Sequence, residues 1–219
     1  MMNFMRFFQT ILAAVLLLCS QLAFALETID WQSLVPPLDE TKDIYSQLPE
    51  ALQESAADLW WATSQQANGN NNEPIEDVRK RSAARLEANG IDAEALMRGM
   101  SEFAELVEEN GTKMVAELDG KKVKMPGYVL PIEYSGTRVV EFLLVPYVGA
   151  CVHTPPPPAN QMVHVKLDEG FESEGLFMPV WVTGKINTVM TTQAVSFEDG
   201  AADIETGYSI DAADVVPYQ

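Results

Sequence analysis

The chain has 219 residues, with 14 lysines and arginines against 32 aspartates and glutamates, for a formal net charge of -18 at pH 7. A surface this acidic repels nucleic-acid phosphates and anionic lipid head groups, so nucleic acid is excluded from the expected partners. The length fits one ordinary domain, or a small helical part joined to a compact β domain.

Residues 1–25 predict a cleaved secretory signal peptide. Arg6 gives it a positive start, Ile11–Leu18 is an apolar run too short to span a membrane, and Ala23-Phe24-Ala25 matches a cleavage site. We therefore expect a periplasmic protein that begins near Leu26 and has no transmembrane span once the signal is removed. An uncleaved membrane anchor is the alternative.

Residues 26–110 predict a helical N-terminal region. Apolar residues recur at helical spacing in three segments, and the first holds one or two helices because Pro49 interrupts it. Asp92 is a predicted N-cap, and Gly90 is a predicted helix-ending glycine. The three segments are Asp39–Trp61, Glu76–Ala88 and Ala93–Glu109. We interpret this region as a packing element or docking surface without chemistry of its own.

Residues 111–219 change to the period of two that is typical of strands. Gly184 is predicted to mark a bulge or a barrel corner. Five or more short strands with glycine corners favour a small β-barrel, so the fold class is α+β. The predicted strands are Met114–Leu118 and Val123–Met125 as a hairpin about Asp119-Gly120, then Tyr128–Tyr134, Arg138–Val145, Gln161–Leu167, Pro179–Ile186 and Glu205–Val216.

The stretch Val145–Lys166 concentrates the chemically versatile side chains of the chain. It holds both histidines, His153 and His164, and also Cys151, which becomes the single thiol once the signal peptide is gone. Pro155–Pro158 separates His164 from the other two and favours a stiff polyproline II connector. If the chain turns after the prolines, a thiolate and two imidazoles meet, which is a ligand set suited to zinc or copper. We therefore predict a zinc or copper site made by Cys151, His153 and His164.

Two other interpretations of this stretch stay open. In the first, Cys151 is buried and the proline-rich loop docks a partner protein. The docking residues are then Pro155, Pro156, Pro157, Pro158, Asn160 and Gln161. In the second, Cys151 is a nucleophile with His153 or His164 as its base, but neighbours at i and i+2 in a strand are seldom well placed for proton transfer. We therefore favour a non-catalytic protein.

Several segments of the β region resemble a known bacterial family. They are Gly127–Pro131 (GYVLP), Glu141–Tyr147 (EFLLVPY), Gly149–Gln161 (GACVHTPPPPANQ) and Val180–Gly184 (VWVTG). In these residues the chain is similar to the exported family named domain of unknown function 3299. The resemblance implies an OB-like antiparallel β-barrel for residues 111–219, and it implies no established activity.

The same resemblance implies a partner, because members of the family are often encoded beside ABC-type transporter components. We accordingly expect an exported accessory protein that binds a zinc or copper ion and serves an envelope transport system. The alternative is a non-catalytic interaction module that docks a transporter or another envelope partner through the proline-rich loop.

Overall fold

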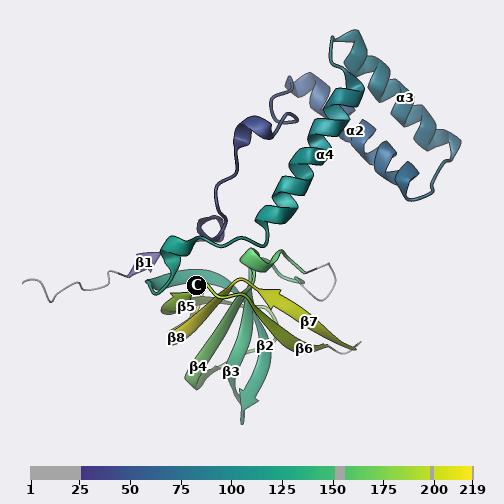
Figure 1. Ribbon diagram of the computed structural model, residues 1–219. Helices are drawn as coiled ribbons and strands as arrows, with labels where there is room; N and C mark the ends of the chain where they lie inside the picture. Colours follow the sequence, from purple (N-terminus) through teal and green to yellow (C-terminus); the bar gives the residue numbers. More distant parts are fainter. Residues whose placement is uncertain (1–25, 151–155, 198–199, 219) are drawn as a thin grey trace, which may run out of the picture. The chain divides into compact units, whose positions relative to one another are not determined.

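The computed structural model describes residues 26–150, 156–197 and 200–218, which divide into two compact units (Figure 1). One unit is helical and consists of Val35–Met114 with Pro158–Asn160. The other is a β-barrel built from Val115–Pro157 and Gln161–Gln219, together with the chain before Val35. The predicted α+β class, with an N-terminal helical segment followed by a small OB-like barrel, is confirmed.

The helical unit holds three helices, two of which begin at a capping asparagine or aspartate. Pro49 directly precedes the first helix, the Asn72 side chain accepts from the Ile75 amide, and the Asp92 side chain accepts from the Ala95 amide. Gly90 follows the second helix at φ +80°, as its sequence position predicted. The helices are α2 (Glu50–Ala67), α3 (Glu73–Ala88) and α4 (Ala93–Asn110).

The apolar stripes of these helices pack into one buried cluster, whose core is Leu52, Ala56, Leu59, Leu86, Ala93 and Leu96. The predicted helix over residues 39–61 is wrong in its first part. Glu40–Lys42 is a short 3-10 turn, η2, and the regular helix begins only at Glu50, after the proline. No helix in the described part of the chain combines the length and the apolarity that a membrane crossing needs.

The barrel unit closes five strands into a ring, in the order β2-β3-β4-β8-β5 and back to β2. The β4–β8 pair is parallel and the other four pairs in the ring are antiparallel, which is the strand order of an OB fold. The short strand β1 adds to β2 in parallel. The strands are β1 (Glu27–Thr28), β2 (Lys122–Ser135), β3 (Arg138–Val145), β4 (Val163–Glu172), β5 (Met178–Asn187), β6 (Thr191–Phe197), β7 (Gly200–Thr206) and β8 (Tyr208–Pro217).

Gly184 marks an irregularity of β5, as predicted. The register against β8 shifts between Thr183 and Gly184. A Cβ at Gly184 would lie 2.4 Å from the Asp211 carbonyl oxygen and 2.8 Å from the Ala212 Cα, so only glycine lets the two backbones approach this closely.

The predicted strand pattern differs from the structure in several places. The predicted strands Val123–Met125 and Tyr128–Tyr134 are one strand, β2, and the predicted strand Glu205–Val216 covers the end of β7 and most of β8. Ala116–Leu118 is a 3-10 turn, η3, rather than one arm of a hairpin, because the Val115 amide binds a tyrosine hydroxyl instead of a neighbouring strand. Strand β6 and its pairing with β7 as a hairpin were not predicted. The hairpin is inserted between the last two strands of the ring, β5 and β8.

This inserted hairpin lies on one side of the barrel (Figure 1) and packs against it through apolar side chains. Val195 of β6 and Ile204 of β7 pack on apolar residues of β2, β3 and the segments beside β4. Their barrel partners in the buried cluster are Leu130, Leu143, Val145, Ala150 and Met162. OB folds that bind oligonucleotides or sugars use the face of their second and third strands, which here are β3 and β4. In this protein part of that face is an internal contact.

Tyr208, the first residue of β8, is fully buried. Its hydroxyl donates to the Leu34 carbonyl oxygen at 2.8 Å and accepts from the Val115 amide at 2.6 Å. Burial raises the pKa of Tyr208, so the phenol stays protonated and keeps its role as a donor. One side chain therefore holds the end of the N-terminal segment against the start of the barrel sequence.

We expect the substitution Tyr208→Phe to lower the free energy of unfolding by about 1–3 kcal/mol, because it leaves a buried carbonyl and a backbone amide without their partner. Urea unfolding of the parent and the variant measures this difference. Tyr134→Phe, at an exposed tyrosine of β2, is the matched control and should leave the free energy unchanged. Equal stabilities for the parent and Tyr208→Phe would contradict the clamping role of the hydroxyl.

Candidate functional site

The structure describes only part of the predicted metal site. Cys151 and His153 lie outside the described residues, as does Pro155, while His164 lies on β4. The convergence of the three metal ligands therefore stays a prediction. Among the described residues, no three His, Cys, Asp or Glu side chains gather as a metal ion would require.

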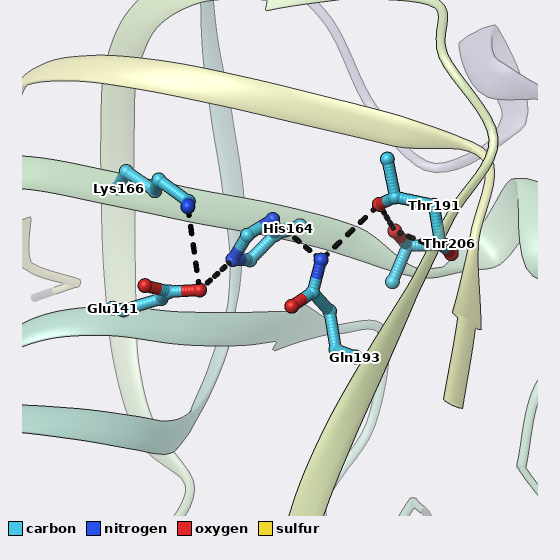
Figure 2. Close-up of polar contacts among 6 residues, drawn as sticks. All are labelled: Glu141, His164, Lys166, Thr191, Gln193 and Thr206. Carbon is cyan, nitrogen blue, oxygen red and sulfur yellow. Dashed lines mark hydrogen bonds and ion pairs between the residues drawn. The ribbon is translucent and has the colours of Figure 1, made fainter. Parts of the chain in front are cut away.

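His164 is the centre of a polar cluster between the barrel and the inserted hairpin (Figure 2). It lies on β4, and only 3% of the residue is exposed. On β3, Leu143 stands directly opposite His164, and Glu141 stands opposite Lys166. This register brings the Glu141 Oε1 to 2.6 Å from the His164 Nε2 and 3.6 Å from the Lys166 Nζ.

The hairpin completes the cluster from the other side. Gln193 of β6 places its Nε2 3.1 Å from the His164 Nδ1 and 3.3 Å from the Thr191 Oγ1. The Thr191 Oγ1 lies 2.8 Å from the Oγ1 of Thr206 on β7, which is fully buried. Figure 2 shows this continuous line of contacts from Lys166 to Thr206. Three barrel side chains and three hairpin side chains thus share one hydrogen-bonded network.

These contacts favour one tautomer of the imidazole. An amide nitrogen can only donate, so in this orientation of Gln193 the His164 Nδ1 accepts and the ring proton lies on Nε2, which faces Glu141. Burial lowers the pKa of His164, and the Glu141 carboxylate opposes that shift. A neutral imidazole agrees with both neighbours, because a second proton on Nδ1 would face another donor.

The chemistry available to His164 follows from its partners. A histidine paired with a carboxylate is the arrangement of a general base, but its other nitrogen contacts Gln193 rather than a nucleophile. The cluster therefore acts, in this conformation, as a polar link inside an apolar contact. A metal ion could reach His164 only at Nδ1 and only after the Gln193 amide moved away.

Sequence reasoning identified His164 but missed all of its partners. One signal was present, since Glu141 is the single charged residue in the apolar run Val139–Val145. An acid in a buried strand needs a hydrogen-bonding partner, and the nearest unexplained polar residue of the sheet was His164. Gln193 and the two threonines carried no comparable signal, because the pairing of β6 with β7 was not predicted.

Asn160 and Gln161, the predicted docking residues after the prolines, make hydrogen bonds within their own units. The buried Asn160 amide donates to the Asn110 carbonyl oxygen at 2.8 Å and to the Lys113 carbonyl oxygen at 3.0 Å, in the helical unit. Its backbone amide donates to the Gly111 carbonyl oxygen at 3.0 Å.

In the barrel unit, the Gln161 Nε2 donates to the Trp31 carbonyl oxygen at 2.9 Å. Of the described prolines in the run, Pro156 and Pro158 are exposed and Pro157 is half-buried. Docking of a partner on these residues stays a prediction.

The fold and the cluster define the protein as an OB-like barrel with an inserted hairpin, joined to a three-helix unit. The chain belongs to the family described as "Protein of unknown function (DUF3299)", whose model matches residues 31–217. It is similar to a DUF3299 family protein from Pseudomonas aeruginosa PAO1 of known crystal structure. The two are 26% identical, the match covers 89% of this chain and 97% of that one, and the TM-score is 0.46. A comparison with curated proteins finds no match.

We expect the free energy of unfolding to fall as the pH drops below about 6.5, because the unfolded chain then takes up a proton that native His164 resists. The folded pKa is lowered, so this contribution is complete above the unfolded pKa and is lost as the pH falls through the folded one. Urea unfolding at several values between about pH 7 and pH 5 measures it.

The control for this pH dependence is His164→Gln, which keeps a polar side chain but does not titrate in this range. His153 is present in both proteins, so its titration cancels in the comparison. The parent should lose more stability than the variant over the acidic half of the series. Parallel pH profiles for the two proteins would show that His164 has no such effect.

Proposed function

We propose that this protein is an exported, non-catalytic interaction module that docks a protein partner of the cell envelope through its proline run. The observation that carries the proposal is the fixed position of Asn160, the second residue after the prolines. Asn160 makes three hydrogen bonds to the carbonyl oxygens of Asn110, Gly111 and Lys113, while Pro156 and Pro158 remain exposed.

This combination is what a docking loop needs. Proline fixes its own φ, so consecutive prolines lose little further conformational entropy when a partner binds them. A hydrogen-bonded end reduces that cost again, because the loop is already held before it meets the partner. Exposed proline rings then offer apolar surface at a small entropic cost.

The barrel supports a role in protein docking rather than nucleic-acid binding. Part of its β3–β4 face packs on Val195 and Ile204 of the inserted hairpin. The net charge of -18 adds repulsion of any phosphate backbone. The family resemblance suggests the class of partner, an ABC-type transporter component, and the predicted signal peptide suggests that they meet in the periplasm.

The test is crosslinking from a photoreactive amino acid placed at Pro156, with the full chain expressed in its native bacterium. We expect one envelope protein to be captured, and we expect Asn160→Ala to reduce the yield severalfold because the loop loses its fixed end. The same photoreactive residue at the exposed barrel residue Tyr134 is the matched control. Equal capture from both positions, or none from Pro156, would rule out docking at the prolines.

A second candidate function is metal binding, and the Glu141–His164 pair specifically favours it. Histidines that bind metals commonly donate their other ring nitrogen to a carboxylate, which fixes the tautomer and makes the ligand nitrogen more basic. Glu141 stands in this relation to His164 at 2.6 Å and leaves Nδ1 as the ligand nitrogen. Cys151 and His153 would be the further ligands, and the ion would displace Gln193.

The metal content of the protein from Leu26 to Gln219, purified without a polyhistidine tag, tests this candidate. If the three residues bind zinc or copper, the parent should hold one equivalent and a Cys151→Ser, His153→Ala double variant should hold none. Gln193→Ala should then strengthen binding, because it frees Nδ1. Metal content in the parent no higher than in the double variant would exclude the site.

A further inference from the structure

The barrel carries a groove that neither the polar cluster nor the proline run uses. It has a volume of about 250 Å³ and lies over β2 and the start of β5. Three aromatic and three proline side chains line it: Trp31, Tyr128, Tyr218, Pro126, Pro146 and Pro179. They come from five separate parts of the barrel sequence, so the fold alone assembles the groove.

Close packing under the groove fixes its shape. Gly127 lies between Pro126 and Tyr128, and a Cβ there would be 2.6 Å from Leu144 Cγ and 3.0 Å from the Trp31 indole. The glycine therefore allows the indole to lie directly on β2. On the opposite wall, the ring of Tyr218 stacks on Trp181 with 5.3 Å between centroids, and the Tyr218 amide donates to the Pro179 carbonyl oxygen at 2.9 Å.

The groove offers hydrogen-bond donors that the protein does not use. The Trp31 indole and the hydroxyls of Tyr128 and Tyr218 make no side-chain hydrogen bond within the described part of the chain. An indole N–H can only donate, and a phenol donates readily. A suitable ligand therefore presents acceptors and apolar surface together, and few donors of its own.

A proline-rich segment in the polyproline II conformation has these properties. Its residues lack the backbone N–H, its carbonyl oxygens point outward without internal hydrogen bonds, and its rings are apolar. Grooves lined by aromatic side chains are the usual receptors for such segments. At about 250 Å³ the groove is smaller than the 300–1,000 Å³ typical of small-molecule and cofactor pockets, which favours a short stretch of an extended peptide.

We infer that this groove binds a proline-rich segment of a partner protein, and that the segment carries lysines or arginines beside its prolines. The second part follows from charge, since a net charge of -18 attracts a basic peptide and repels an acidic one. Lys124 keeps its positive charge over the Trp181 ring, 4.9 Å from the centroid, so the preference for a basic peptide comes from the net charge of the whole chain. This inference does not depend on docking through the protein's own proline run.

The experiment uses a fluorescent synthetic peptide of four prolines with two lysines at each end, titrated with the purified protein. A peptide in which alanines replace the four prolines has the same charge and is the first control. We expect the proline peptide to bind about tenfold more tightly, because only it fits the aromatic groove. Salt of about 0.15 M in both titrations limits the shared electrostatic attraction.

Variants assign the binding to the groove. Tyr218→Ala should weaken binding about tenfold, as expected for an aromatic side chain at the centre of a contact. Tyr218→Phe should weaken it by a smaller factor, because it removes the donor and keeps the ring. Tyr134→Ala, at an exposed tyrosine outside the groove, should bind as the parent does. If Tyr218→Ala disturbs folding, the Phe variant still tests the hydrogen bond.

Three results would overturn the inference. Equal affinities for the proline and alanine peptides would mean that only charge drives binding. Parent-like binding by both Tyr218 variants would place the peptide elsewhere on the protein. Self-association of the parent that is lost in Tyr218→Ala and competes with the peptide would assign the groove to the proline run of a second copy instead of a partner protein.

Discussion

The barrel unit depends on one hydroxyl group. Tyr208 begins β8, the strand that closes the ring, and its phenol binds the backbone of Leu34 and of Val115. These two residues flank the sequence that forms the helical unit, so the phenol pins the chain where it leaves the barrel and where it returns. The segment before Leu34 includes Trp31, whose carbonyl oxygen binds Gln161 and whose indole lines the aromatic groove. A buried hydrogen-bonded tyrosine thus gives a long N-terminal segment a defined position on the barrel.

The inserted hairpin is held by two kinds of contact with different roles. Burial of its apolar side chains, Val195 and Ile204, stabilises the hairpin on the barrel. Because the hydrophobic effect has no direction, this burial does not fix which residues of the hairpin face the barrel. The hydrogen-bonded contacts from Glu141 through His164 to Gln193 fix the position of the hairpin, because each donor must meet its own acceptor. A displacement of the hairpin by one residue would turn Gln193 away from the imidazole and leave a buried nitrogen unpaired. We interpret the network as the feature that selects one register for the hairpin.

The five strands of the barrel ring were easier to predict from the sequence than the inserted β6–β7 hairpin, for physical reasons. Arg138–Val145 was predicted with its observed bounds, because a dense apolar run between a turn and a proline has few other interpretations. The bulge at Gly184 followed from a lone glycine within a strand pattern. The hairpin was missed because β6 (TTQAVSF) and β7 (GAADIET) hold few large apolar residues and are rich in Thr, Ala and acidic residues. His164 was predicted to be a metal ligand because the chain has only two histidines. The number of histidines does not reveal which residues surround His164. Its partners depend on how strands that are distant in the sequence align. Cys151 and His153 lie outside the described residues, so that part of the site remains a prediction.

The attachment of Asn160 has a consequence for how the protein is made. Its side-chain amide donates to the carbonyl oxygen of Asn110, the last residue of α4, and to that of Lys113 just after the helix, although some fifty residues of chain separate Asn160 from Asn110. A ribosome completes all three helices, and then β2 and β3, before it adds this asparagine. During translation these two carbonyl oxygens therefore lack the asparagine side chain as a partner, and water takes its place. The helical unit therefore gains its last residues, Pro158–Asn160, only after almost half of the barrel sequence has been synthesised. A nascent chain that stalls before Asn160 would carry all three helices without this contact.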